Sequence, residues 1–323
     1  MSKYSTKKIG SGDFDLLIPL MKDCFGMDVN LAYFQWKYLD NPAGGFIGFI
    51  AVDNETGEVG AYYGVIPQNL VIDGIERTVY QSCDTMTHSK HRRQGLFKML
   101  ALECYDYLRN NNELFVIGFG GADSTPGFIK FGWKHVFNFR YCFKPAALCR
   151  MAALQSFSQN NFSETPSLEQ LNSLTGRQIK SGAIHSKRST THILWRTKNN
   201  HFNYSFVFYK PKNEVLGYAV YYINDNKLIL FDFIFYTAKS RRALIWYLSK
   251  VVTKNKYKAI IAYCQEKGDR EKQLKRSFFI SNPFKKGPLS ERTPFIFFAE
   301  EQVMEKYALP QHWQMCSYDH DAL

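Results

Sequence analysis

The sequence predicts an α/β (α+β) protein made of two domains of the same kind. Its 323 residues exceed the usual size of one domain, and 45% are hydrophobic against 22% charged, which is typical of a folded globular chain. Helix-like and strand-like hydrophobic patterns alternate along the chain, and the pattern of the first half recurs in the second. Each half is long enough to bury a core of its own.

The first half reads as an ordered series of helices and strands. We expect a helix from Asp13, as its N-cap, to Gly26, and a second over 31–39 that follows Asn30 and stops before Pro42. Strands are expected at 46–52, at 59–65 and from Asp73-Gly74 to Thr87. The remaining expected elements are a helix at 96–109, a buried strand at 114–119, a short helix at 125–131 ended by Gly132, and a strand at 133–143.

The second half repeats this series in the same order, which indicates an internal duplication. Trp36-Lys37 has a counterpart in Trp195-Arg196, strand 58–62 in 215–219, and Asp84 in Asp232. Arg92-Arg93 corresponds to Arg241-Arg242, which opens a helix to Val252, and strand 114–119 to 259–263.

The composition between the two halves predicts where the domains end. Ser, Asn, Gln and Thr are frequent between residues 155 and 175, which is typical of a surface connector. We therefore expect an N-terminal domain over 1–145, a connector over 146–180 and a C-terminal domain over 181–323.

One loop of the first half has the features of an anion-binding site. A strand ends near Thr87, and a basic turn with Gly95 then opens a helix at Leu96. The first N–H groups of a helix have no partner inside it and favour an anion. Arg92 and Arg93 add positive charge, and Gly95 permits a close backbone approach. The second copy, 241–246, has no such glycine, so the loop between Met86 and Phe97 is expected to hold a pyrophosphate in the first half only.

This loop resembles the coenzyme A motif of the GNAT N-acetyltransferase superfamily, R/Q-x-x-G-x-G/A at the start of a helix. Here it reads Arg92-x-x-Gly95-x-Phe97, with Phe97 in place of the final small residue. The stretch 127–133, which ends in Lys-Phe-Gly-Trp, resembles the superfamily's second landmark, and 175–323 resembles a second, degenerate GNAT unit.

The resemblance implies a fold, a co-substrate and a reaction. Each domain would hold a mixed, centrally splayed sheet flanked by helices, and in the first domain the pantetheine arm of acetyl-CoA would lie between strands 81–87 and 114–119. An amine would then attack the thioester directly. The residues expected to bind acetyl-CoA are Thr85, Met86, Thr87, Arg92, Arg93, Gln94, Gly95, Leu96, Phe97 and Phe128.

This reaction needs a base for the ammonium, and the sequence offers three candidates. Asp84 lies in the strand beside the expected gap, and a hydrogen-bonded structural aspartate is the alternative interpretation. His88 follows in the loop, where it could equally be a solvated histidine. The tail 317–321, Ser-Tyr-Asp-His-Asp, is the third, against the alternative of a disordered terminus.

The acid is where the sequence departs from the superfamily. The position of the family's tyrosine is Phe128, which has no proton to donate. Ser124, Thr125 or Tyr141 could replace it, or coenzyme A could leave as a thiolate, since a thiol pKa is about 8.5.

Charge and cysteine content limit the compartment and the partners. The net charge of +12 favours an anionic partner, yet no arginine-rich tail is present, so nucleic acid is not the first expectation. Seven cysteines without a C-x-x-C pair indicate reduced thiols in a cytoplasm and no metal site, and the N-terminus has no apolar signal region. No apolar run is long enough to span a bilayer.

The function predicted from the sequence is an acetyl-CoA-dependent N-acetyltransferase. Its acceptor would be a primary amine on a small, anionic molecule such as an amino sugar or a sugar nucleotide. Two alternatives remain open: a transferase of tandem-GNAT type that takes amino acids from aminoacyl-tRNA, and a CoA-binding protein without catalytic activity.

Overall fold

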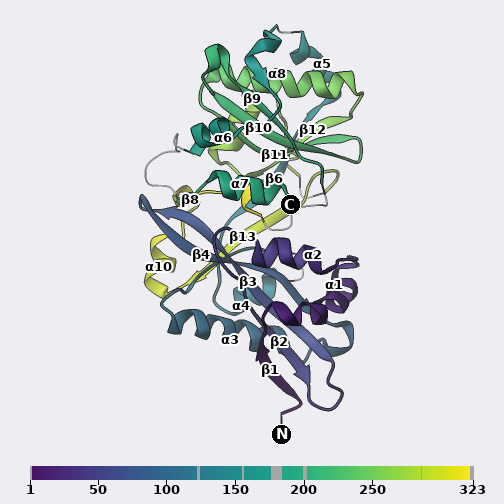
Figure 1. The fold of residues 1–323 in the computed structure, drawn as a ribbon, viewed down its shortest axis with the longest axis vertical. Helices are drawn as coiled ribbons and strands as arrows, with labels where there is room; N and C mark the ends of the chain where they lie inside the picture. The colour runs from purple at the N-terminus through teal and green to yellow at the C-terminus, as the bar shows by residue number, and fades with distance from the viewer. Residues whose placement is uncertain are drawn as a thin grey trace. The chain divides into compact units, whose positions relative to one another are not determined.

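The computed structural model describes residues 2–121, 124–154, 156–175, 184–198, 202–284 and 286–320. The chain divides into two compact units, each built on a sheet with helices packed against it (Figure 1). Unit 1 consists of Met1–Val136 and Pro294–Pro310, and unit 2 of Phe137–Thr293 and Gln311–Leu323. Both units are of mixed α/β character, in agreement with the predicted fold class.

The sheet of unit 1 is antiparallel except for one parallel pair, β4 with β5. The tight turn at Asp73-Gly74, where both residues have positive φ, joins β3 to β4 as a hairpin. In spatial order the strands are β1 (Tyr4–Lys8), β2 (Ile47–Asp53), β3 (Val59–Ile72), β4 (Ile75–Thr87), β5 (Phe115–Phe119) and β13 (Arg292–Ala299).

Helices cover both faces of this sheet because side chains alternate between its faces along each strand. Phe49 and Tyr63 pack in the core on the side of α3, whereas Ile50 and Tyr62 pack in the core on the side of α1. The helices of unit 1 are η1 (Ser11–Leu16), α1 (Leu17–Phe25), α2 (Leu31–Phe34), the π-helical η2 (Gln35–Leu39), η3 (Ser89–His91), α3 (Leu96–Asn110), α4 (Thr125–Lys130) and α10 (Glu301–Lys306).

The main strands of unit 2 have the same plan, with β11 and β12 parallel and the other neighbours antiparallel, and β8 with β14 adds a short parallel pair. Its strands are β6 (Lys134–Pro145), β12 (Ala259–Gln265), β11 (Lys227–Phe235), β10 (Gly217–Asn224), β9 (Ser205–Tyr209) and β7 (Phe162–Ser163); β8 (Ile184–Ser186) pairs with β14 (Trp313–Gln314). Its helices are α5 (Ala146–Ala153), η4 (Gln159–Asn161), α6 (Leu168–Thr175), α7 (Thr190–Thr197), η5 (Pro211–Asn213), α8 (Ala238–Lys254), α9 (Asp269–Lys275), η6 (Pro310–His312) and η7 (Ser317–Asp319).

The closing strand of each sheet comes from the other half of the chain. Strand β6 follows β5 and α4 in sequence but pairs with β12, and β13 follows β12 and α9 but pairs with β5. Residues 294–310 therefore belong to unit 1. The linear boundaries expected at residues 145 and 181 do not anticipate this exchange, and they stay a prediction.

The start of the first helix differs from the expectation. Asp13 is not its N-cap; it is the third residue of η1, where its carboxylate accepts hydrogen bonds from the Gly10 amide and the Lys7 ammonium group. The α-helix proper begins at Leu17 and ends at Gly26, whose φ of 67° is typical of a helix C-terminus. The second helix begins as expected, because the Asn30 side chain accepts a hydrogen bond from the Ala32 amide.

Candidate functional site

Asp84 lies at an irregularity of β4 in unit 1. The pairing of β3 with β4 shifts between Tyr62 and Gly64, which face Met86 and Cys83, so that two residues of β4, one of them Asp84, lie opposite Tyr63. Asp84 has a φ of 47°, which a residue with a Cβ rarely adopts. Such a bulge bends the strand and redirects a side chain, and bulges are frequent beside active sites.

The carboxylate of Asp84 is already engaged by two residues of the helical turn η2. Its oxygens lie 2.9 Å and 2.8 Å from the Lys37 ammonium nitrogen, and the Tyr38 hydroxyl donates to it at 2.7 Å. Lys37 is 2% exposed as a side chain and Asp84 10%, so the ion pair is buried. A buried pair of this kind holds its members in place, because removing one leaves the other charge without compensation.

The parallel ladder between β4 and β5 is short. It pairs Tyr80 with Val116 and Gln81 with Ile117, and β4 then continues to Thr87. The bulge at Asp84 lies in this continuation. Beyond Gln81 the described residues form no further pair between β4 and β5, and this is the place where the resemblance predicts a gap between the two strands.

The loop that follows β4 is fixed to α1 by Asp23. The Asp23 carboxylate accepts hydrogen bonds from the Ser89 amide at 2.7 Å and the Ser89 hydroxyl at 2.8 Å, and the Ser89 amide bond is the main cause of its lowered pKa. The His88 ring accepts from the Lys90 amide at 3.3 Å and lies 3.9 Å from Asp23. His88 therefore acts in the structure as the cap of η3, rather than as a histidine exposed to solvent on all sides.

His91 anchors the same loop to the sheet. It is buried, its ring contacts the Tyr4 hydroxyl at 2.9 Å, and a Cβ on Gly60 would approach the ring to 3.0 Å. The absence of a side chain at Gly60 thus lets the histidine pack directly against β3. His91 is not among the site residues predicted from the sequence, although its place directly before Arg92-Arg93 could have indicated it.

The backbone at 92–95 presents the start of α3 to solvent. Arg93 and Gly95 have positive φ angles of 64° and 76°, and a Cβ on Gly95 would meet no atom of the described residues within 4 Å. The first intrahelical bond there is donated by the Met99 amide to the Gly95 carbonyl, at 3.1 Å, so the amides of the preceding helical turn are not used inside the helix. Because Arg92 and Arg93 are exposed beside those amides, the region combines donors, positive charge and free space.

Phe97 replaces the small residue of the motif and packs inward. Its ring lies 4.9 Å from the Phe128 ring and 5.1 Å from the Phe131 ring, and a Cβ on Gly127 would approach it to 2.8 Å. Because Gly127 has no side chain, the Phe97 ring can pack against the backbone of α4. The contact of Phe97 with Phe128 packs the start of α3 against α4.

The other predicted residues of the co-substrate site fall into two groups. Met86, Leu96 and Phe128 have buried side chains in the two cores of unit 1, so only their backbone could meet a ligand. The rest are Thr85 and Thr87, half-buried at the end of β4, and Gln94, exposed in the loop.

Ser124 precedes α4 and is half-buried, with no side-chain capping bond. Its neighbour Thr125 donates its hydroxyl to the Gly121 carbonyl at 2.7 Å. Tyr141 lies in unit 2, where it packs on Tyr263 at a ring distance of 5.0 Å.

In unit 2 the corresponding strands, β11 and β12, contact the C-terminal segment of the chain. The ladder of β11 and β12 pairs residues 228–230 with 260–262, and both strands continue past it. In that continuation Cys316 forms an antiparallel bridge with Cys264, and the Ser317 hydroxyl donates to the Phe231 carbonyl. The C-terminal segment 313–320 thus occupies in unit 2 the place that corresponds to the region beyond Gln81 in unit 1.

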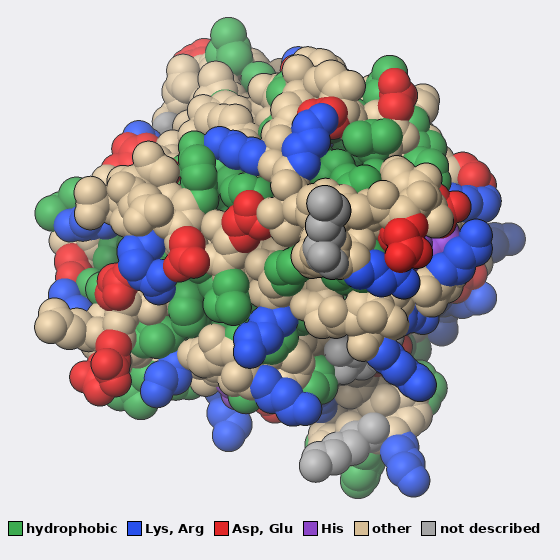
Figure 2. All heavy atoms as spheres, turned by 90° about the horizontal axis from the view of Figure 1, so that it is seen from below, with side chains coloured by type: hydrophobic (Ala, Val, Ile, Leu, Met, Phe, Trp, Pro, Cys, Tyr) green, Lys and Arg blue, Asp and Glu red, His purple; other side chains and the backbone are tan. Residues whose placement is uncertain are grey.

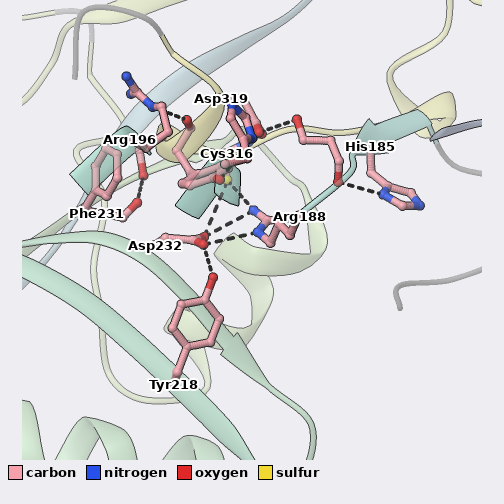
Figure 3. Close-up of polar contacts among 12 residues, drawn as sticks. His185, Arg188, Arg196, Tyr218, Phe231, Asp232, Cys316 and Asp319 are labelled. Atoms are coloured by element: carbon pink, nitrogen blue, oxygen red, sulfur yellow. Dashed lines mark hydrogen bonds and ion pairs between the residues drawn. The ribbon is translucent and has the colours of Figure 1, made fainter. Parts of the chain in front are cut away.

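A buried polar network holds this segment, and Asp232, the counterpart of Asp84, is at its centre (Figure 3). Asp232 accepts from Arg188 at 3.1 Å, from Arg270 at 2.8 Å and from the Tyr218 hydroxyl. Burial opposes its ionisation, but the two guanidinium groups outweigh burial and lower the pKa of Asp232 to about 2. Arg188 also donates to the Cys316 sulfur at 2.9 Å.

The C-terminal segment is therefore not a mobile acidic tail. Asp319 is 3% exposed, and its carboxylate accepts from the Ser186 hydroxyl and, at 2.6 Å, from the Cys316 amide. Arg196 donates to the carbonyls of Tyr318 and His320. These bonds fix the described part of the segment, and Asp321 lies outside the described residues.

The start of α8 also differs from that of α3. Thr237 caps it through a reciprocal pair of hydrogen bonds with Ser240, so the Ser240 amide is already satisfied at 2.9 Å. Arg241-Arg242 does not open this helix as expected, because α8 begins at Ala238, and Ala243, the next position, is buried inside it. The features of an anion site that unit 1 combines are thus not repeated at this helix.

Comparisons with known proteins bear on the fold and on the family. Residues 5–136 match the model of the acetyltransferase (GNAT) domain family. A search among curated protein sequences finds no match.

Several solved structures share the fold over nearly the whole chain. A probable N-acyltransferase from Enterococcus faecalis V583 has a TM-score of 0.74 at 10% identity, over 94% of this chain and 74% of that one. A GCN5-related N-acetyltransferase from Anabaena variabilis has a TM-score of 0.69 at 9% identity, over 95% and 75%. The N-myristoyltransferase of Saccharomyces cerevisiae, solved with bound myristoyl-CoA, has a TM-score of 0.60 at 12% identity, over 93% and 79%.

At these identities the structural likeness establishes the fold, and the family model adds the sequence evidence for unit 1. The match covers the bulge at Asp84, the loop before α3 and the contact of α3 with α4. The acetyltransferase (GNAT) family is therefore supported by sequence for residues 5–136 of unit 1 and by the shared fold for the rest of the chain.

Proposed function

We propose that this protein transfers an acyl group, acetyl in the first instance, from acyl-CoA to a primary amine on a small acceptor. The start of α3 carries this proposal: Gly95 stands in open space at a φ of 76°, beside exposed Arg92 and Arg93 and the free amides of the first helical turn. This combination suits a pyrophosphate, which needs several donors at close range and little steric hindrance.

The backbone of β4 beyond Gln81 fits the rest of the co-substrate. Residues 82–87 pair with β3 on one side and continue past the end of the ladder with β5. A pantetheine arm carries amide groups that can pair with such a strand edge. Bound there, acyl-CoA supplies an activated thioester, and the half-buried Thr85 and Thr87 line its approach.

The proton transfers are assigned to this chain's own groups as follows. Asp84 and His88 remain the proposed acceptors of the ammonium proton, and Ser124 the proposed donor near the leaving group. The contacts of Asp84 with Lys37 and Tyr38 favour a carboxylate that orients its surroundings, so a water molecule would relay the proton to it. Coenzyme A can also leave as a thiolate, since a thiol pKa is about 8.5.

We infer a small anionic acceptor, such as an amino sugar or a sugar nucleotide, from the net charge of +12. On the face shown in Figure 2, Lys and Arg side chains are spread among acidic and apolar ones rather than gathered in a single stripe. That distribution suits a small acceptor better than the long phosphate backbone of a tRNA.

One observation favours a second candidate, a CoA-binding protein without catalytic activity. Phe128 stands where the family has its tyrosine, and it is 4% exposed within a cluster with Phe97 and Trp133. No conformational change of this side chain could supply a proton. The acid must then come from another residue or be dispensable.

Two measurements in sequence separate these candidates. Thermal unfolding with acetyl-CoA tests binding, and release of free coenzyme A with a panel of amines tests transfer. We expect stabilisation and turnover on at least one amine. Stabilisation without turnover would favour the CoA-binding protein, and no stabilisation by any acyl-CoA would refute the proposed site.

A further inference from the structure

A segment of unit 2 exposes large apolar side chains among basic ones. Between Lys272 and Lys286 the sequence contains no acidic residue. Within it Phe278 is 71% exposed, Ile280 47% and Phe284 72%. Scattered exposed apolar residues are ordinary, but a concentration of them beside positive charge marks an interaction site.

The backbone at Phe278 makes this exposure unusual. After α9 the Phe279 amide donates to the Leu274 carbonyl and the Phe278 amide to the Lys275 carbonyl, which is the hydrogen-bond pattern of a Schellman C-cap. Phe278 occupies the left-handed position of this motif with a φ of 62°. Glycine is the residue preferred there, so a phenylalanine is unfavourable for the backbone and gains little from packing.

The buried side chain of Lys144 stabilises this turn. It is 1% exposed, donates to the Ser277 carbonyl at 2.7 Å, and places its ammonium group 5.5 Å from the Phe278 ring and 5.9 Å from that of buried Phe279. The Phe278 ring thus has a cation–π contact with Lys144, while the residue stays 71% exposed. Ile280 follows two residues later and pairs through its backbone with Phe143.

Arginines from another helix join this segment. Arg276 lies two residues before Phe278 in the chain, and its positive charge, with burial and the charge of Arg242, lowers the pKa of Arg241. Arg242 and Arg276 are exposed. A cluster of like charges is costly in the free protein and becomes favourable when an anionic surface approaches.

We propose that this face of unit 2, formed by Phe278, Ile280 and Phe284 with Arg241, Arg242 and Arg276, docks on an anionic lipid bilayer. The aromatic and aliphatic side chains would enter the interfacial layer, and the arginines would contact the lipid headgroups. The charge of the surface complements that of the lipids.

Nucleic acid is the rival anionic partner, and the apolar residues decide against it. Aromatic rings can stack on bases, but Ile280 offers no flat face for stacking. Insertion into a bilayer uses aromatic and aliphatic side chains alike. The proposal does not depend on the proposed acyl transfer, because none of these residues lies in unit 1.

Vesicle binding by the full chain tests the proposal. We would measure cosedimentation with phosphatidylcholine vesicles with and without phosphatidylserine, and we expect binding only when the anionic lipid is present and a loss of binding at high salt. Phe278→Gly places the preferred residue at the left-handed position, so it should fold at least as well as the parent while binding vesicles about tenfold more weakly. Arg276→Glu should weaken binding by a similar factor.

Matched controls come from unit 1. Phe25→Gly removes an aromatic side chain that is 48% exposed, and Arg77→Glu reverses an exposed charge; neither should change vesicle binding. Binding of acetyl-CoA should be equal in all four variants, which separates this test from that of the proposed function. Absence of binding to anionic vesicles, or parent-like binding by Phe278→Gly, would overturn the proposal. Loss of tRNA retention on filters by Phe278→Gly, with vesicle binding unchanged, would assign the face to nucleic acid instead.

Discussion

Gly95 is the residue on which the proposed co-substrate site depends most. Its φ of 76° and the open space around its Cβ position mean that a side chain there would be strained but would not collide with the protein. The same side chain would project into the region proposed for the pyrophosphate. A substitution at Gly95 should therefore change ligand binding much more than it changes folding.

We predict that Gly95→Asp weakens acetyl-CoA binding at least a hundredfold, about 2.7 kcal/mol, because it adds bulk and negative charge where phosphate is proposed to bind. The left-handed backbone should lower the free energy of unfolding by only about 1–2 kcal/mol. Isothermal titration and urea unfolding measure the two effects.

Gly74→Asp is the matched control for this change. Gly74 has a φ of 78° and likewise no atom within 4 Å of its Cβ position, but it lies in the β3–β4 turn. It should lose similar stability and keep its affinity. Equal affinities of the parent and Gly95→Asp would show that the loop does not bind the co-substrate.

The pair formed by Asp84 and Lys37 allows a catalytic role to be distinguished from a structural one. Asp84→Asn alone leaves the buried Lys37 ammonium group uncompensated and should destabilise the protein by roughly 3–5 kcal/mol. The double variant with Lys37→Met removes both charges and should recover most of that stability.

Turnover then decides the role of Asp84. If it accepts the proton of the attacking amine, the double variant should remain at least tenfold slower in kcat than the parent while binding acetyl-CoA normally. Recovery of kcat together with stability would restrict Asp84 to a structural role. Coenzyme A release and calorimetry on the same preparations provide both readings.

These two sites also differ in how far the sequence could predict them. A glycine between a basic pair and an amphipathic helix is a local pattern, and Gly95 directly precedes the helix that begins at Leu96, as expected. The partner of Asp84 is 47 residues away, on a π-helical turn whose bond pattern no local propensity specifies. Lys37 was visible only as a landmark of the duplication.

At the scale of elements, the strands and helices follow from hydrophobic periodicity, but the strand partners do not. β6 and β13 both read as apolar strands, and either could pair with β5 or β12 by pattern alone. The exchange of β6 and β13 between the two halves depends on contacts between residues far apart in the sequence, which a local pattern does not specify. The same holds for the C-terminal segment, whose polar residues read as a free terminus and are buried around Arg188 and Asp232.

Helix α7 contacts the C-terminal segment 313–320 through His192, and this contact should make the stability of unit 2 sensitive to acid. His192 packs against Trp195 and contacts the Tyr318 hydroxyl at 3.1 Å, and burial together with the charges of Arg196 and Arg188 lowers its pKa from 6.5 to about 3. Burial also lowers the pKa of His185. Both rings are therefore neutral in the folded state at neutral pH.

We predict that unit 2 loses stability as the pH falls from about 6.5 towards 3. Above 6.5 neither the folded nor the unfolded state protonates His192, so its contribution is fully present. Below 6.5 only the unfolded state takes up the proton, and the free energy of unfolding should fall by up to about 1.4 kcal/mol per pH unit for each such histidine.

His192→Gln tests this prediction, because glutamine can still accept a hydrogen bond from Tyr318 but does not titrate. Urea unfolding followed by tryptophan fluorescence should show a shallower loss of stability in the variant between pH 6.5 and 3. Parent and variant should show the same pH dependence above pH 7. Parallel curves over the acidic range would mean that His192 titrates normally in the folded state.

At the scale of the molecule, the two units keep the same plan but differ where a ligand could bind. Unit 1 has a strand edge beyond a short parallel ladder and an uncapped helix start with Gly95. In unit 2, Cys316 and Ser317 contact the corresponding strands, and Thr237 caps the corresponding helix. Unit 1 thus keeps the features proposed for a co-substrate site, whereas the corresponding place in unit 2 is filled by the chain's own C-terminal segment.

This asymmetry predicts that each chain binds one acyl-CoA. In the parent, calorimetric titration should give one site per chain, and in Gly95→Asp it should give none, because no second site replaces it. Unit 2 should stay closed even at high ligand concentration, since opening it would expose Asp232 and its arginines without their partners in segment 313–320. A second, weaker site that persists in Gly95→Asp and disappears when Ala243 is enlarged would place acyl-CoA in unit 2 and refute the closed state inferred for it.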